Sequence, residues 1–142
     1  MASDPAAGWL LDSQLERDSA AIGDLPLCHV RLMNDINYPW LILVPRRRGA
    51  SEITDLTEVD RTQLMREMAR AVQALKSETR CDKINVAAIG NVVAQLHVHV
   101  VARFRTDAAW PKPVWGAKPT RTYESAAMDR SIAALRAQLA LA

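Results

Sequence analysis

The stretch QLHVHVVARF, residues 95–104, decides the fold because polar and apolar side chains alternate along most of it. Successive side chains of a β-strand point to opposite faces, and residues i and i+2 lie roughly 6.5–7 Å apart on one face. One face of this predicted strand is largely polar and carries Gln95, His97, His99, Val101 and Arg103. The other face is apolar, which predicts packing against a helix, and carries Leu96, Val98, Val100, Ala102 and Phe104.

Two hairpins account for the strands of the chain. Alternation indicates a strand over Leu25–Met33, and the apolar run WLILVP indicates another over Trp40–Pro45. These two strands are close enough in sequence to pair as an antiparallel hairpin. A strand over Lys83–Gly90 precedes the histidine strand, and the short segment NVVA between them suits a second hairpin connection.

Three helices are expected around these hairpins. A short helix over Leu10–Ala21 has Asp12 or Ser13 as its N-cap, and a C-terminal helix follows Tyr123. The longest helix begins at Thr57, which is a favourable N-cap residue. Its apolar residues recur at helical spacing, and we expect the methionines among them to fill the core: Leu64, Met65, Met68, Val72 and Leu75.

The elements follow the order α-β-β-α-β-β-α, with helices between strands that come in pairs. This order predicts an α+β fold, in which an antiparallel sheet carries the long helix on one face and a further helix follows at the C-terminus. The chain has 142 residues, of which 49% are hydrophobic, so we expect one domain over residues 1–142 with a substantial core.

Composition and charge exclude several classes of protein. With 18 basic and 16 acidic residues the formal net charge is only +2, which is no electrostatic footprint of a nucleic-acid-binding protein. The one basic run, Arg46–Arg48, is either a solvated turn or a phosphate clamp. No stretch approaches the ~18 apolar residues of a membrane span. Cys28 and Cys81 lack metal-site spacing, and no signal peptide is evident, so we expect a cytoplasmic protein.

The spacing of the two histidines, two residues apart on a strand, would allow them to act together on one substrate. A neutral imidazole such as that of His97 can attack phosphorus, and its neighbour His99 can hydrogen-bond a phosphate oxygen or the leaving group. Two alternatives stay open from the residues alone. The pair can be ordinary surface histidines, or it can supply two metal ligands, which requires a third ligand from His29, Cys28, Cys81 or a distant carboxylate. Arg103 is either a phosphate contact or a solvated arginine at the end of the strand.

The run GNVVAQLHVHVV, Gly90–Val101, resembles the signature of the histidine triad (HIT) superfamily. The order hairpin, long helix, hairpin is similar to the HIT fold, as is LMNDINYPWLILVP over residues 32–45. The resemblance covers about residues 10–104, and residues 105–142 form a C-terminal extension. Within that extension, Trp110 and Trp115 either border the active site or pack their proline-rich loop onto the domain.

The resemblance implies roles for individual residues. His97 aligns with the family's nucleophile, which becomes nucleotidylated, and His99 aligns with the histidine that assists at the phosphate. Asn91 is expected near the α-phosphate, and Asn34 or Asp35 is expected to hold the ribose hydroxyls. The implied protein is a nucleotidyl hydrolase or transferase that cleaves nucleoside phosphoramidates or dinucleoside polyphosphates through a covalent nucleotidyl-histidine. It is a homodimer that acts on a purine nucleotide such as AMP and needs no cofactor or metal.

Gln95 is a departure from the family pattern, because it stands where the first histidine of the triad belongs. A glutamine side chain donates and accepts hydrogen bonds, but it cannot carry a proton at neutral pH. The substitution is similar to one in a bacterial branch of the HIT superfamily. It leaves an alternative function open, namely a catalytically weak or inactive purine-nucleotide-binding module.

Overall fold

The computed structural model describes residues 3–141, which form five strands and three α-helices. The elements are α1 (Ser13–Asp18), β1 (Ser19–Asp24), β2 (Cys28–Met33), β3 (Trp40–Pro45), the 3-10 helix η1 (Ile53–Asp55), α2 (Glu58–Thr79), β4 (Lys83–Ala87), β5 (Val98–Arg103) and α3 (Ser125–Gln138). All neighbouring strands are antiparallel, in the order β1-β2-β3-β5-β4. The predicted α+β fold is therefore confirmed.

The prediction was wrong at the N-terminal helix and at the start of the histidine strand. The helix ends at Asp18, and the next six residues form β1, which pairs with β2 and shifts register between Ala21 and Gly23. Pairing with β2 and burial of Ile22 hold these residues in a strand instead of the predicted helix. β5 begins only at Val98, so Gln95 and His97 lie in the loop that leads into it.

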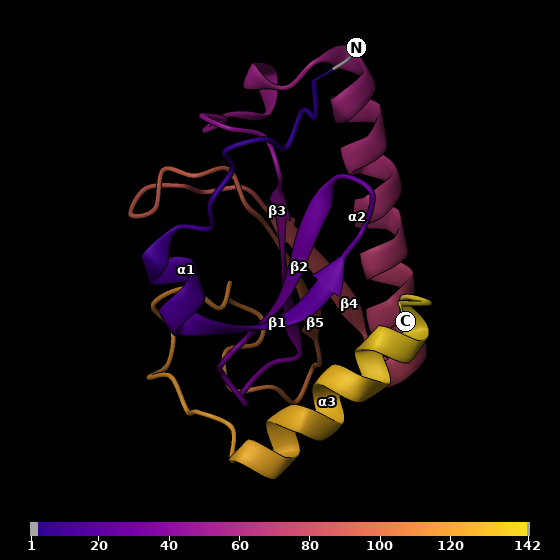
Figure 1. Ribbon diagram of the computed structural model, residues 1–142. Coiled ribbons are helices and arrows are strands. Elements are labelled where there is room, and N and C mark those ends of the chain that lie inside the picture. The colour runs from indigo at the N-terminus through magenta and orange to yellow at the C-terminus, as the bar shows by residue number, and fades with distance from the viewer. Residues whose placement is uncertain (1–2, 142) are drawn as a thin grey trace.

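The two faces of the sheet carry different layers, as Figure 1 shows. On one face, α2 and α3 cover the main core, to which β5 contributes Val98, Val100 and Ala102. On the other face, α1 and the loop after β5 enclose a smaller cluster that contains Leu15, Trp40 and Val101. The apolar face predicted for residues 96–104 thus packs against the helices, and the histidine face lies in the layer of the smaller cluster.

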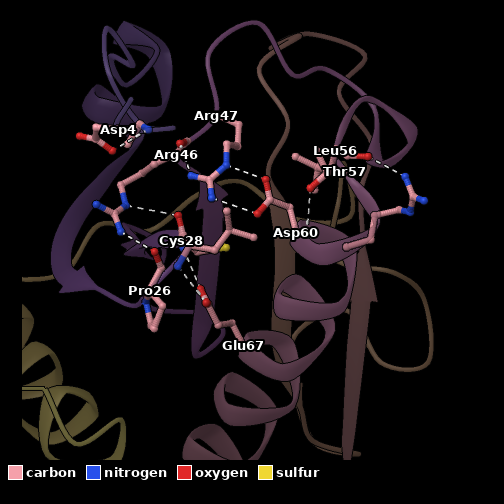
Figure 2. A network of polar contacts seen from close by, with 12 residues as sticks. Asp4, Pro26, Cys28, Arg46, Arg47, Leu56, Thr57, Asp60 and Glu67 are labelled. Atoms are coloured by element: carbon pink, nitrogen blue, oxygen red, sulfur yellow. Dashed lines mark hydrogen bonds and ion pairs between the residues drawn. The ribbon is translucent and has the colours of Figure 1, made fainter. Parts of the chain in front are cut away.

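The long helix α2 is held by its cap and by one buried carboxylate. The Thr57 hydroxyl accepts the backbone N–H of Asp60 at 3.2 Å, as the predicted N-cap requires. Glu67 is fully buried, and its two oxygens accept the backbone N–H groups of Leu27 and Cys28 at 2.9 and 2.7 Å (Figure 2). Met65 is 63% exposed, so it does not fill the core as predicted.

Two of the three arginines in the basic run after β3 have partners within the protein, so they are neither solvated nor part of a phosphate clamp. The guanidinium of Arg46 donates to the backbone carbonyls of Leu25, Pro26 and Leu27. Arg47 forms a bidentate ion pair with Asp60, in which Nε and Nη2 donate to the two carboxylate oxygens at 2.6 and 3.0 Å (Figure 2). These two arginines therefore fasten the β1–β2 turn and the start of α2. Within residues 3–141, no helix is both long enough and apolar enough to cross a membrane.

Candidate active site

His97 and His99 lie side by side in the layer opposite α2. Their ring centroids are 4.8 Å apart and their planes meet at 72°, edge to face. Both rings are largely buried, with 6% and 5% of each residue exposed. His97 is the last loop residue before β5 and His99 is the second residue of the strand, so the pleat directs them to the same side.

A backbone hydrogen bond determines the tautomer of His97. Its Nδ1 lies 2.7 Å from the carbonyl oxygen of Gln95. A carbonyl oxygen can only accept, so Nδ1 carries the hydrogen and donates it. In the neutral ring the lone pair then resides on Nε2. The loop backbone thus leaves the lone pair of the neutral His97 ring on Nε2.

His99 has the opposite tautomer. The indole N–H of Trp40 donates to its Nδ1 at 3.0 Å, so the hydrogen of the neutral ring is on Nε2. The indole of Trp115 packs on the ring at 5.2 Å between centroids. Burial, together with the neighbouring His97, lowers the pKa of His99 to about 4. At neutral pH His99 is therefore an uncharged hydrogen-bond donor that lies beside His97.

This pKa predicts a specific loss of stability in acid. An ordinary histidine titrates near 6.5 and His99 near 4, so the unfolded chain takes up the proton first as the pH falls. The contribution of uncharged His99 to the free energy of unfolding is fully present above about pH 6.5. It decreases by about 3 kcal/mol as the pH falls towards 4. Urea unfolding at pH 7 and pH 4 measures it against a His99→Gln variant, which lacks the titrating group. Equal losses in the two proteins would contradict the assignment.

The histidines border a cleft of about 310 Å³ that several elements share. α1 and β2 contribute Gln14, Leu15, Asp18 and Met33, the loop before β5 contributes residues 89–93, and Trp40 and Trp115 complete the wall. Asn91 is an exposed residue of that loop and lines the cleft. Among the described residues that line the cleft, the one charged side chain is Asp18.

A second cavity of about 290 Å³ adjoins the cleft, and the two share Asp18, Met33 and Trp40. Its other lining residues are Arg17, Asn34, Asp35, Thr120 and Thr122. The last two belong to residues 119–123, a segment outside the helices and strands that we call the strap. The structure therefore places Asn34 and Asp35 beside the histidine cleft, together with part of the C-terminal extension.

The side chain of Gln95 does not line the cleft with the histidines. Its amide oxygen accepts the backbone N–H of Asp12 at 2.8 Å, and its amide nitrogen donates to the carbonyl of Leu10 at 2.8 Å. Asp12 is the N-cap of α1, where its carboxylate accepts the N–H of Gln14. Gln95 thus joins the histidine loop to the start of the helix that forms one wall of the cleft.

The sequence profile of the HIT domain matches residues 14–106, which include both histidines and every strand. The chain belongs to the HIT domain family. Among solved HIT proteins, a histidine triad protein from Bradyrhizobium japonicum is 52% identical, with a TM-score of 0.90 over 92% of this chain and 98% of that one. A histidine triad protein from Sinorhizobium meliloti is 42% identical, with a TM-score of 0.91 over 94% and 98% of the two chains.

The curated relatives of this HIT domain are longer proteins. An AP-4-A phosphorylase from Mycobacterium tuberculosis is 35% identical over 91 residues, which are 57% of this chain and 46% of that protein. The chain thus spans about half the length of the curated relatives that it matches.

Arg103 shares the histidine face of this HIT domain but is committed elsewhere. It is 1% exposed, and its guanidinium makes two bonds to Asp107, at 2.8 and 3.1 Å. It also donates to the Asn85 side chain and the Lys112 carbonyl, both at 2.7 Å. Arg103 is not among the residues that line the cleft or the adjoining cavity. The predicted phosphate contact is therefore replaced by a structural role, the anchoring of the loop after β5.

Sequence reasoning missed Trp40 and Asp18 as residues of the site. In the sequence Trp40 is only the first residue of an apolar run, and nothing in that pattern indicates that its indole N–H donates to His99. Trp115, one of the two tryptophans of the proline-rich loop, lines the cleft. Within residues 3–141, no group of three or more His, Cys, Asp and Glu side chains is placed to hold a metal ion.

Proposed function

We propose that this HIT domain protein is a nucleotidyl hydrolase or transferase that works through a covalent nucleotidyl-His97 intermediate. The observation that carries the proposal is the bond from His97 Nδ1 to the Gln95 carbonyl, because it leaves the Nε2 lone pair for attack. The His99 ring lies 4.8 Å from the His97 ring between centroids, and its uncharged Nε2–H can serve as a donor for a phosphate oxygen. The similarity to an AP-4-A phosphorylase supports a nucleotide as substrate.

The proposed reaction has two displacements at the α-phosphorus of a nucleoside phosphoramidate or a dinucleoside polyphosphate. His97 Nε2 forms a bond to phosphorus in line with the leaving group, whose bond breaks and which takes up a proton from solvent when it is an amine. Water then attacks phosphorus, the P–N bond to His97 breaks, and a proton returns to solvent. In a transfer reaction another nucleophile replaces water. His99 and Asn91 donate to the phosphate oxygens in both steps.

Turnover is the direct test of this function. The protein is incubated with adenosine phosphoramidate and, separately, with a dinucleoside tetraphosphate, and release of the nucleoside monophosphate is followed. An alkaline quench, which preserves phosphorus–nitrogen bonds to histidine, allows a covalent adduct to be located by mass spectrometry. We expect release of the monophosphate and an adduct on His97. Absence of both would exclude the proposed function.

The second candidate is a purine-nucleotide-binding module with weak or no catalysis. It is favoured by Gln95, which we infer to occupy the first triad position and which cannot transfer a proton at neutral pH. Tight binding of AMP in a calorimeter, without turnover of either substrate, would select this candidate over the enzyme.

We further propose that Gln95 is a positioning residue. Gln95→Ala removes both bonds to the segment Leu10–Asp12, so we expect turnover to fall by roughly ten- to a hundredfold through misplacement of the cleft wall. The pH profile should keep its shape, because no titrating group is lost. Gln73→Ala, an exposed change on α2, is the matched control. A profile that changed shape in Gln95→Ala would contradict the positioning role.

The family likeness also supports two proposals about organisation. We propose a homodimer and a single domain over residues 1–142, with a core of about 10–104 and the C-terminal extension 105–142. Sedimentation velocity measures whether the protein is a homodimer. A single cooperative transition in urea, followed by fluorescence and circular dichroism together, measures the second.

A further inference from the structure

The loop after β5 forms a pocket of about 550 Å³, which we call the loop pocket. All of its lining residues lie between 108 and 118, and they include Trp110, Lys112, Trp115 and Lys118. The matched HIT domain ends at residue 106, so the loop pocket belongs entirely to the C-terminal extension.

Buried contacts hold the backbone of this loop in place. Asp107 accepts the backbone N–H of Trp110 at 2.7 Å. Arg103, which is bonded to Asp107, donates to the carbonyl of Lys112, and its guanidinium lies 5.7 Å from the centre of the Trp110 ring. Val114, midway along the loop, is buried in the smaller cluster. The pocket is therefore formed before a ligand binds, which lowers the cost of ordering its groups.

The loop pocket carries positive charge that no carboxylate compensates. Lys112 and Lys118 are both exposed, and within residues 3–141 neither side chain forms an ion pair. None of the described residues that line the pocket is acidic. The described lining of the histidine cleft, by contrast, includes no lysine or arginine, and its one charged side chain is Asp18. A chain of phosphates therefore finds cations in the loop pocket and not in the cleft itself.

Trp115 connects the loop pocket with the cleft, because it lines both. Its ring lies 5.2 Å from the ring of His99, which lies 4.8 Å from the ring of His97. The cavity that the strap helps to line adjoins the cleft at other residues, and the ribose is expected there. A nucleotide with its α-phosphorus at His97 and its ribose toward that cavity directs its leaving group past His99 toward the loop pocket.

The proton requirement of the leaving group favours a phosphate over an amine. When His97 attacks a dinucleoside polyphosphate, the Nε2–phosphorus bond forms and the bond from phosphorus to the bridging oxygen breaks. The electron pair stays on that oxygen, which leaves as the terminal phosphate oxygen of a nucleotide and needs no proton. An amine must be protonated as it leaves. His99 is uncharged at neutral pH and Gln95 cannot transfer a proton, so neither supplies one.

We propose that the loop pocket receives the phosphates of an anionic leaving group, with the ammonium groups of Lys112 and Lys118 on the phosphate oxygens and Trp115 at the entrance. This inference rests on the proposed function and names its substrate class. The protein favours dinucleoside polyphosphates, which lose a nucleoside polyphosphate, over phosphoramidates, which lose an amine. The two lysines are specificity-determining residues that lie outside the matched HIT domain.

The ratio of kcat/KM for the two substrates tests this role of the lysines. In the double variant Lys112→Gln, Lys118→Gln we expect kcat/KM for a dinucleoside tetraphosphate to fall roughly tenfold, as the loss of two exposed charge contacts allows. For adenosine phosphoramidate, which has no phosphate beyond the α-phosphorus, it should change by less than about twofold. The double variant Arg66→Gln, Lys76→Gln removes the same charge from exposed positions on α2 and is the matched control. Equal effects on both substrates would overturn the inference.

Binding of inorganic tripolyphosphate, measured by calorimetry, tests the pocket without a nucleoside and without turnover. We expect the wild type to bind it and the double lysine variant to bind it roughly tenfold more weakly at low salt. The difference should shrink at about 1 M salt, where exposed charges are screened. Equal affinities at low salt, or no binding to the wild type, would overturn this inference alone. Failure of the wild type to turn over either substrate would overturn the proposed function, and the leaving-group role with it, even if tripolyphosphate binding depended on the lysines.

Discussion

Replacing the His97 imidazole is expected to abolish turnover. In His97→Ala no nitrogen remains to form the bond to phosphorus, and we expect kcat to fall by at least about 10⁴-fold, as is typical when a covalent nucleophile is removed. The covalent adduct should disappear at the same time. Steady-state release of nucleoside monophosphate and intact-mass analysis after an alkaline quench measure the two effects.

The control for this prediction is His29→Gln. His29 lies on β2 and pairs with Asp24 at 2.6 Å, outside the residues that line the cleft. We expect it to retain activity. Full activity in His97→Ala, or an adduct on another residue, would show that the nucleophile is misassigned even if the enzyme class is right.

Removing Arg103 is expected to cost about 3–5 kcal/mol of folding free energy. Arg103→Ala leaves Asp107 as a buried carboxylate without its partner, which is strongly destabilising. Burial alone would raise the pKa of Asp107, and the bonds from Arg103 and from nearby backbone N–H groups bring it below its usual value instead. Urea unfolding at neutral pH measures the loss.

Arg66→Ala, an exposed arginine on α2, is the matched control and should change the free energy of unfolding by less than about 0.5 kcal/mol. A different result for Arg103→Ala would support the phosphate contact that the sequence predicts for this residue. In that case Arg103→Ala would remain as stable as the wild type and its KM for the nucleotide substrate would rise.

Local patterns in the sequence predicted much of the fold because local physics determines those elements. The apolar run Trp40–Pro45 and the N-cap Thr57 lie where they were expected. β1 was not predicted because its residues form a strand only by pairing with β2. Pairing with another segment of the chain produces no periodic pattern of apolar residues in the sequence itself. Strand alternation likewise continued through Gln95, although the regular strand starts at Val98.

The candidate site was predictable only in part. The alternation of side chains along a strand correctly predicted that His97 and His99 share one face. Contacts between distant segments determine what each residue does. The Trp40 bond to His99 spans 59 positions and the Tyr123 bond to Asn34 spans 89, so neither could be read from a motif. Gln95 was expected beside the histidines and instead contacts residues more than eighty positions earlier.

The register of β5 has a consequence for how activity depends on stability. His99 faces the cleft only because Val98 and Val100, its neighbours on either side, face α2 and the main core. A slip of one residue would exchange the two faces, so the core and the cleft form in the same cooperative step. A substitution that weakens the core at Val100 should therefore lower the number of active molecules, while each molecule that remains folded keeps its full turnover rate.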